Sequence, residues 1–280
     1  MREIPVEKIT EEVKRLCIEA NYFLGQDVLQ AFHTFREREE SPLGRDILDQ
    51  LTENARIAAD GQFPICQDTG FAVIFIELGQ EVQLTGGGLE QAVNEGVRQG
   101  YGEGYLRRSI VRDPLNRANT GDNTPAVLHT EIVSGDQVRI VVAPKGGGSE
   151  NMSRIKMLKP ADGAQGVKEF VIETVQLAGS NPCPPVIVGV GIGGTFEKCA
   201  QLAKKSLLRE LGRPHLDPFY ATMERELLEK VNNLGIGPQG LGGRTTALGV
   251  HIETYPCHIA SLPVAVNIQC HAVRHKSAVI

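Results

Sequence analysis

The sequence predicts a mixed α/β protein of the α+β type, with a helical N-terminal part before a body of mixed strands and helices. Two observations predict this class. Apolar residues recur at helical spacing through residues 1–60, and short dense apolar runs bounded by glycine and proline fill residues 61–280. No internal repeat or low-complexity linker interrupts the chain. We therefore expect one domain, 1–280, with a helical lead 1–60 and a mixed body 61–280.

Two helices are expected in the lead. The first carries a stripe of apolar residues with a period near 3.6, namely Ile9, Val13, Leu16, Cys17, Ala20 and Leu24. The second begins at Ser41-Pro42, where an N-cap residue precedes a proline at the first helical position, and it ends at Gly61.

The first half of the body predicts strands around one helix. The apolar run 71–78 predicts a strand, and 89–99 predicts a helix that the Gly-Tyr-Gly-Glu-Gly of residues 100–104 should break. The runs 127–133 and 137–143 flank Ser-Gly-Asp, which favours a hairpin turn.

The second half predicts alternating elements. Helices are expected at 166–178, 195–211 and 218–234, and strands at 185–192, 246–252 and 262–268. Gly189 to Gly194 match the pattern G-x-G-x-x-G, which would indicate an NAD-dependent dehydrogenase. That fingerprint also needs an acidic residue ending a second strand about 20 residues later. Here residues 204–214 instead predict a helix end, so we interpret the glycines as a tight strand-to-helix turn.

Composition narrows the function classes. The 280 residues are 41% hydrophobic and 22% charged, which is typical of a globular protein. The net charge of −5 and the absence of a basic tract argue against a nucleic-acid partner. No apolar run is long enough to predict a membrane span or a signal peptide. Six widely spaced cysteines do not form a disulfide framework, so we expect reduced thiols in the cytoplasm.

The cysteines fall into two groups. Cys17 and Cys199 lie on predicted helices and are expected to be packed thiols. Four lie in loops or turns beside predicted strands: Cys66, Cys183, Cys257 and Cys270. Cys183 is held between prolines, which stiffen the backbone and would present a thiolate in one direction.

Loop cysteines so far apart cannot form a zinc ribbon, which needs local pairs. Three thiolates suit an iron–sulfur cubane with one iron left without a protein ligand. That iron can act as a Lewis acid on a hydroxyl or carboxylate. A zinc site remains an alternative, built from Cys257, His258, Cys270, His271 and His275.

At these residues the sequence resembles the class I iron–sulfur fumarase family, which includes L-tartrate dehydratase, and specifically the α subunit of its two-subunit form. The resemblance covers nearly the whole chain. Its marks are Cys66-Gln-Asp-Thr-Gly70, Tyr105-Leu-Arg-Arg-Ser109, Asn119-Thr-Gly-Asp-Asn123, Lys145-Gly-Gly-Gly-Ser149, Cys183-Pro-Pro185, Gly193-Gly-Thr195, and His258 with Cys270.

The resemblance implies a 4Fe–4S cluster held by Cys66, Cys183 and Cys270, with one iron not ligated by protein. It gives Cys257 no ligand role. It also implies that Gln67 and Asp68 reach the substrate, and a carboxylate beside a cluster ligand is suited to proton transfer. We expect Asp68 to be catalytic; the alternative is an Asx turn before Thr69.

Three further substrate contacts are implied. Arg107 should clamp a carboxylate, because a guanidinium binds it through two parallel hydrogen bonds, and Arg108 is the fallback. Gly147 lies in a loop without side chains, where a backbone N–H can approach an anion. His258 lies twelve residues before Cys270, which is the spacing of a substrate-facing histidine in that family.

The expected function is reversible hydration of the small dicarboxylate fumarate to L-malate, together with a separate β subunit. The Lys145 to Ser149 and Leu106 to Ser109 motifs favour fumarate, and L-tartrate dehydration is the alternative. The sequence stops at Ile280, soon after the last cluster cysteine, and shows no second domain. We therefore expect a heteromer whose active site forms only with the β subunit. The remaining alternative is a non-catalytic binding subunit.

Overall fold

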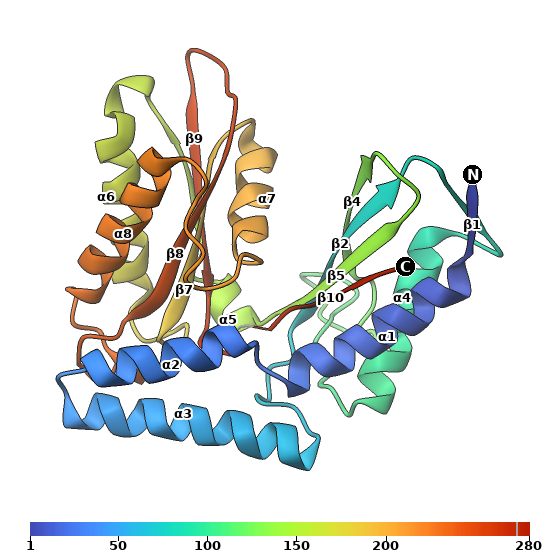
Figure 1. The fold of residues 1–280 in the computed structure, drawn as a ribbon, viewed down its shortest axis with the longest axis horizontal. Helices are drawn as coiled ribbons and strands as arrows, with labels where there is room; N and C mark the ends of the chain where they lie inside the picture. The colour runs from blue at the N-terminus through green and yellow to red at the C-terminus, as the bar shows by residue number, and fades with distance from the viewer. Residues whose placement is uncertain (273) are drawn as a thin grey trace. The chain divides into compact units, whose positions relative to one another are not determined.

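The computed structural model describes residues 1–272 and 274–280. Strands and helices alternate through most of the chain after a helical start, which confirms the mixed α/β class (Figure 1). The chain forms two compact units that interleave in sequence. Unit 1 comprises Met1–Gly25, Asn54–Gly147 and Arg274–Ile280, and unit 2 comprises Gln26–Glu53 and Gly148–Val273. The expectation of one domain, 1–280, stays a prediction.

Unit 1 is built on a four-stranded sheet. Its strand order is β10 (Lys276–Val279), β5 (Val138–Lys145), β2 (Phe71–Gly79), β4 (Val127–Val133). The unit also contains helices α1 (Val6–Tyr22) and α4 (Leu89–Glu103). Strand β1 (Arg2–Pro5) pairs in parallel with β3 (Val82–Thr85). The core of the unit joins the apolar stripe of α1 to the inward residues of β2 and β5.

The predicted hairpin between residues 127 and 143 is wrong. Strands β4 and β5 both pair with β2, in parallel and antiparallel register respectively, so β2 lies between them. The Ser-Gly-Asp turn still forms, but it wraps the end of β2, where Gly79 N donates to Gln137 O at 2.9 Å. The reason is burial: β4 has no buried residue and lies at the edge of the sheet, whereas β2 and β5 are mostly buried and are each paired on both sides.

Helix α4 also corrects the sequence analysis, because it runs through the expected breaker to Glu103. Its glycines allow it to pack closely on α1. A Cβ at Gly96 would lie 2.7 Å from Thr10 O, and one at Gly100 would lie 2.9 Å from the Cys17 Cβ. The glycines therefore serve helix packing instead of ending the helix.

Unit 2 has a second four-stranded sheet, in the order β6 (Arg154–Leu158), β9 (Leu262–Gln269), β7 (Val186–Gly193), β8 (Ala247–Tyr255). Helices α6 (Gly163–Ala178) and α8 (Pro218–Asn232) cover one face, and α7 (Phe196–Ser206) covers the other (Figure 1). The main apolar core lies on the α6 and α8 side.

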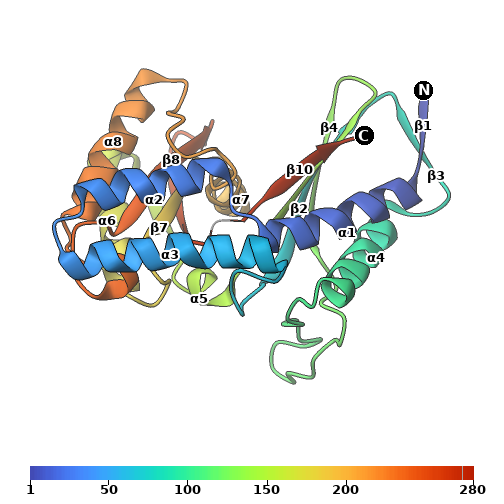
Figure 2. The same ribbon diagram turned by 60° about the horizontal axis from the view of Figure 1, so that its bottom comes forward.

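Two more helices belong to the early part of the chain. Helix α2 (Gln26–Arg38) was not separately predicted, and α3 (Pro42–Gly61) starts as the sequence predicts (Figure 2). The Ser41 hydroxyl accepts from Gly44 N at 3.1 Å, as an N-cap should. A short helix, α5 (Gly147–Glu150), follows β5.

The glycines of residues 189–194 form a strand and a turn, as interpreted. Gly193 and Gly194 have φ of 90° and 72°, which makes the turn from β7 into α7. Cβ atoms at Gly189 and Gly191 would lie 2.2 and 2.0 Å from backbone oxygens of α7. These glycines let α7 lie against the strand, a role that does not require a dinucleotide.

Candidate active site

In unit 1, Asp68 is held at both carboxylate oxygens by backbone N–H groups. Oδ1 accepts from Gly70 N at 3.1 Å, and Oδ2 accepts from Gly147 N at 2.9 Å. The first contact is the Asx turn that the sequence left as an alternative. The second contact brings Asp68 together with the glycine proposed for substrate binding.

The backbone that carries Asp68 is fixed from three directions. The carbonyls of residues 68–70 each accept a hydrogen bond from a distant side chain. Arg274 Nη2 donates to the first at 2.8 Å, Tyr101 Oη to the second at 2.8 Å, and Asn123 Nδ2 to the third at 3.2 Å. Side chains ordered in this way hold the segment that carries the Asp68 carboxylate in one position.

Arg274 is a residue that the sequence analysis missed. It is 2% exposed, and its Nη1 donates to Asn21 Oδ1 at 3.3 Å. No carboxylate forms an ion pair with it among the described residues. A buried cation at this position can attract an anion. The only sequence signal is its position four residues after Cys270.

Cys66 follows a backbone segment that is held on both sides. Ile65 N donates to Asn21 O, and Asn54 Nδ2 donates to Ile65 O, both at 2.9 Å. Cys66 itself is half-buried, and its Sγ lies 3.4 Å from Gln67 Oε1. The thiol therefore sits on fixed backbone while remaining accessible.

Arg107 and Arg108 are both exposed in unit 1. The structure fixes the backbone of Arg107, because its carbonyl accepts from Thr69 Oγ1 at 3.1 Å. The carbonyl of Arg108 accepts from Asn119 Nδ2 at 2.9 Å. The Arg-Arg motif thus lies beside the segment that carries Asp68, with its guanidinium groups accessible to an anion.

In unit 2 the structure brings the loop of Cys183 to the turn after β9. His271 Nδ1 lies 3.0 Å from Cys183 O, and Gln239 Nε2 lies 3.3 Å from the same nitrogen and 2.9 Å from Pro184 O. Cys183 has φ of 55°, a conformation rare for a residue with a side chain. His271 adjoins Cys270, so two of the three proposed cluster ligands share one end of this unit.

Buried oxygens beside Cys270 have no hydrogen-bond partner. Gln269 Oε1 and Asn267 Oδ1 are both buried and without a partner among the described residues. The two residues lie two positions apart on β9, so their side chains share one face of the sheet. A water molecule or a bound group can satisfy these two acceptors.

The other three cysteines, Cys17, Cys199 and Cys257, lie in surroundings different from those of Cys66, Cys183 and Cys270. Cys17 and Cys199 are buried, as predicted, and burial raises the pKa of their thiols to about 12 and about 11. Such thiols are inert and unsuited to metal binding at neutral pH. Cys257 is exposed, and its Sγ lies 3.3 Å from Ser261 O in the turn between β8 and β9.

The structure does not bring His258 to Cys270. His258 is exposed in the turn before β9, whereas Cys270 follows the other end of that strand (Figure 1). A strand of 8 residues at about 3.3 Å per residue separates its ends by roughly 25 Å. One zinc ion therefore cannot join Cys257 and His258 to Cys270 and His271 within this unit.

Among the described residues, no cluster of three or more His, Cys, Asp or Glu side chains is arranged to hold a metal ion. Within the same part of the chain, no helix has the length and apolar character needed to cross a membrane.

The fold and the sequence together define a member of a hydro-lyase family. The chain belongs to the fumarate hydratase (Fumerase) family, whose model matches residues 10–279. This confirms the family resemblance.

Curated relatives cover nearly all of the chain. It is 44% identical over 273 residues to a Methanocaldococcus jannaschii protein provisionally named L(+)-tartrate dehydratase subunit alpha, covering 95% of each chain. It is 35% identical over 278 residues to the L(+)-tartrate dehydratase subunit alpha of Escherichia coli (strain K12), covering 98% of this chain and 91% of that one.

Proposed function

We propose that this chain is the α subunit of a hydro-lyase that dehydrates L(+)-tartrate together with a β subunit. The observation that carries the proposal is near-full-length similarity to proteins named as α subunits of that enzyme, at 44% and 35% identity. This proposal differs from the expectation drawn from the sequence, which favoured fumarate and kept tartrate as the alternative. The α designation of the relatives supports a β partner.

Fumarate hydration is the second candidate. The family is described by that activity, and the Lys145 to Ser149 and Leu106 to Ser109 motifs favour it. Both reactions exchange water across adjacent carbons of a four-carbon diacid. L(+)-tartrate loses a hydroxyl and a proton to give the enol of a keto acid, and fumarate gains both. The two hydrated compounds, L(+)-tartrate and L-malate, differ by one hydroxyl, which a binding site discriminates only when it offers that group a partner.

We propose that Cys66, Cys183 and Cys270 hold a 4Fe–4S cluster with one iron free of protein ligands. Their thiols fit the role because they are accessible, in contrast to Cys17 and Cys199. The backbone beside Cys66 is held by hydrogen bonds, and prolines stiffen the backbone at Cys183. The unpartnered oxygens of Gln269 and Asn267 support a missing group beside Cys270. When bound, such a cluster supplies a Lewis acid for a hydroxyl or carboxylate.

Asp68 is the proposed proton-transfer group. Two backbone N–H groups orient its carboxylate, and three side chains fix the backbone that carries it. A carboxylate oxygen has lone pairs beyond those that accept these bonds, so Asp68 can still take a proton from a substrate carbon. Arg274 holds the backbone at this position through the carbonyl of Asp68.

Binding of the two substrate carboxylates is assigned to Arg107, Gln67 and Gly147. Arg107 is exposed on fixed backbone and can form two parallel hydrogen bonds to a carboxylate. The N–H of Gly147 donates to Asp68, so a substrate oxygen would share or replace that bond. His258 is exposed in the turn before β9, and its contact with a substrate carboxylate or hydroxyl stays a prediction.

The test is a comparison of substrates on the assembled enzyme. The chain would be co-purified with a β subunit under anaerobic conditions, loaded with iron and sulfide, and assayed for kcat/KM on L(+)-tartrate, L-malate and fumarate. We expect kcat/KM for tartrate to exceed that for malate by about 5- to 30-fold, since a paired hydroxyl contributes about 1–2 kcal/mol. A preference for malate and fumarate would favour the second candidate. No turnover of any of the three would contradict the hydro-lyase proposal.

A further inference from the structure

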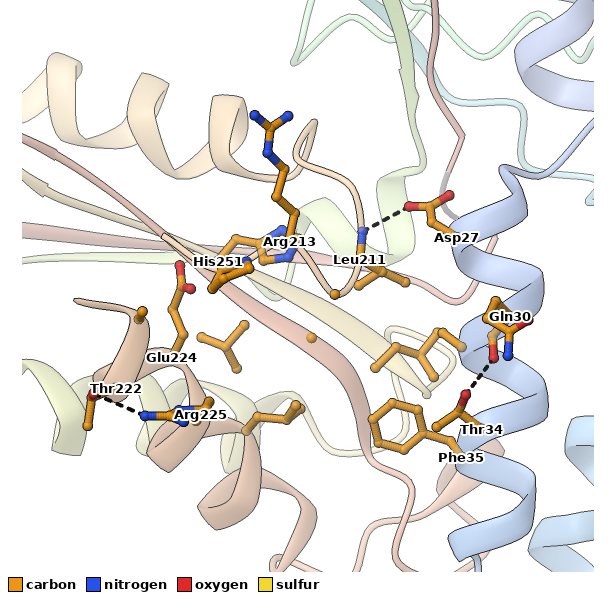
Figure 3. Close-up of a pocket in the computed structure, with 18 of the residues that line it drawn as sticks. Asp27, Gln30, Thr34, Phe35, Leu211, Arg213, Thr222, Glu224, Arg225 and His251 are labelled. Atoms are coloured by element: carbon orange, nitrogen blue, oxygen red, sulfur yellow. Dashed lines mark hydrogen bonds between the residues drawn. The ribbon is translucent and has the colours of Figure 1, made fainter. Parts of the chain in front are cut away.

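A cavity of about 620 Å³ lies within unit 2 (Figure 3). It is open to solvent on one side and is lined by α2, the segment 211–214, α8 and β8. None of the residues proposed for hydration chemistry lines it. Its volume falls in the range of sites that bind small organic ligands. The cavity therefore needs an explanation of its own.

The walls of the cavity are mainly apolar. Phe35 comes from α2, Leu228 from α8, Leu248 and Val250 from β8, and Leu211 from the loop that follows α7. Apolar walls favour the aliphatic or aromatic body of a ligand, because its burial removes apolar surface from water.

One wall of the cavity carries a buried histidine with a free ring nitrogen. His251 is 4% exposed, and its Nδ1 lies 3.2 Å from Ser206 O. A carbonyl can only accept, so Nδ1 carries the hydrogen and Nε2 presents a lone pair. Nε2 has no hydrogen-bond partner among the described residues. Burial lowers the pKa of His251 to about 4, so the ring is neutral at pH 7.

A glycine keeps space open beside that nitrogen. Gly249 lies two residues before His251 on the same face of β8, and a Cβ at Gly249 would lie 3.7 Å from His251 Nε2. The same Cβ would lie 2.7 Å from the Leu211 side chain. A larger residue would therefore close the space beside the imidazole.

The charged side chains that line the cavity and have no partner among the described residues are positive. Arg38 and Arg213 are exposed, and no described residue forms a hydrogen bond or ion pair with either guanidinium. In Figure 3 the Arg213 side chain extends outward from the cavity wall, on a stem flexible enough to cover a bound ligand.

The two acidic residues that line the cavity are already engaged. Asp27 accepts from Leu211 N at 2.9 Å (Figure 3). Glu224 accepts from Arg209 Nη2 at 2.6 Å and from His215 N at 2.9 Å. They leave the arginines as the groups available to a ligand.

We propose that this cavity binds a small amphipathic anion that is distinct from the hydro-lyase substrate. The apolar body packs against Phe35, Leu211 and Leu228. A hydroxyl or N–H of the ligand donates to His251 Nε2, and a carboxylate pairs with Arg213 or Arg38. A four-carbon dicarboxylate lacks the apolar body and would leave these walls in contact with water.

The test uses three fluorescent probes of the same ring system. The first is a hydroxynaphthoate with hydroxyl and carboxylate at opposite ends, the second is naphthoate without the hydroxyl, and the third is naphthol without the carboxylate. Binding to the full chain would be followed by fluorescence and calorimetry. We expect the first probe to bind about fivefold or more tighter than either of the others, because each loses one polar contact.

Variants locate the binding. His251→Asn keeps an amide donor for Ser206 O but removes the acceptor in the cavity. It should abolish the difference in affinity between hydroxynaphthoate and naphthoate, and leave the difference between hydroxynaphthoate and naphthol. Arg213→Gln should reduce the difference in affinity between hydroxynaphthoate and naphthol, and leave the difference between hydroxynaphthoate and naphthoate. Arg117→Gln changes an exposed arginine outside the cavity and should leave all three affinities unchanged.

Equal binding of the three probes, or failure of the hydroxynaphthoate to bind, would overturn the proposal. The probe comparison on the unaltered chain decides the question even if His251→Asn fails to fold. Arg213→Gln changes only a surface side chain and gives an independent check. Since the assay measures binding and needs no cluster or β subunit, its result is separate from that of the hydro-lyase assay.

Discussion

Asp68 Oδ2 accepts a hydrogen bond from the backbone N–H of Gly147 across 2.9 Å, although 79 positions separate the two residues. The contact joins the segment after Cys66 to the glycine loop after β5. Both were proposed from the sequence to meet the same substrate. Their proximity within unit 1 makes Asp68 the first residue to test.

We expect Asp68→Asn to lower kcat by about 10²–10⁴, which is the usual contribution of a general acid or base. Asparagine can keep the Asx turn to Gly70 N but cannot take the proton. Cluster content, measured as iron and sulfide per chain, should not change.

Asp113→Asn is the matched control for this variant. Asp113 also accepts from nearby backbone N–H groups, those of Leu115 and Asn116, in an exposed loop. It should retain full activity. An Asp68→Asn enzyme with more than about a tenth of normal kcat would show that the carboxylate does not transfer the proton.

The cysteines give a second prediction. Cys66→Ser, Cys183→Ser and Cys270→Ser should each lose the cluster, because an alcohol is a far poorer iron ligand than a thiolate. Cys199→Ser should retain it, and so should Cys257→Ser, which is the exposed control. The measurement is iron, acid-labile sulfide and visible absorbance after anaerobic reconstitution. Full cluster content in any of the first three variants would refute that ligand.

Features of the fold that depend on neighbouring residues could be predicted from the sequence. The start of α3 is predicted because Ser41 caps it three residues away. The order of β4, β2 and β5 was missed because burial of a whole strand decides it, and no turn motif records that choice.

The same distinction explains the candidate site. Cys66, Gln67 and Asp68 are adjacent and form one motif, whereas Arg274 reaches Asp68 from 206 positions away. The spacing of twelve residues between His258 and Cys270 marks a family motif and does not predict how far apart the two residues lie. The intervening chain is an extended strand, which carries the two apart.

A third prediction concerns Glu39, which is fully buried in unit 2. Its carboxylate accepts from the backbone N–H groups of Glu40, Ser41, Arg244 and Thr245. Glu39→Gln replaces one acceptor with an NH₂ that faces these donors. We expect a loss of about 2–3 kcal/mol in the free energy of unfolding, measured by urea titration.

The pKa of Glu39 sets the pH range of this contribution. Burial alone would raise the pKa, but the backbone N–H groups of Arg244, Ser41 and Thr245 outweigh burial and hold it below its usual value. The stabilisation is therefore present above the pKa of an unfolded glutamate, near 4.3, and is lost as the pH falls below it. Glu40→Gln, at an exposed neighbour, should cost little. Equal stability of the two variants at pH 7 would contradict this role for Glu39.

The last prediction uses the titration of His251. Burial is the main cause that lowers its pKa to about 4, and the charge of Arg209 acts in the same direction against Glu224 and Asp27. A histidine whose pKa is depressed on folding stabilises the fold fully above its unfolded pKa, near 6.5. The unfolded chain binds the proton first as the pH falls, so stability decreases between about 6.5 and 4 with a slope approaching 1.4 kcal/mol per pH unit. His251→Asn should remove that part of the slope, and His258→Asn, at an exposed histidine, should not. Urea titrations at four or five pH values measure it, and identical slopes in the unaltered chain and His251→Asn would show that His251 is not buried as a neutral ring.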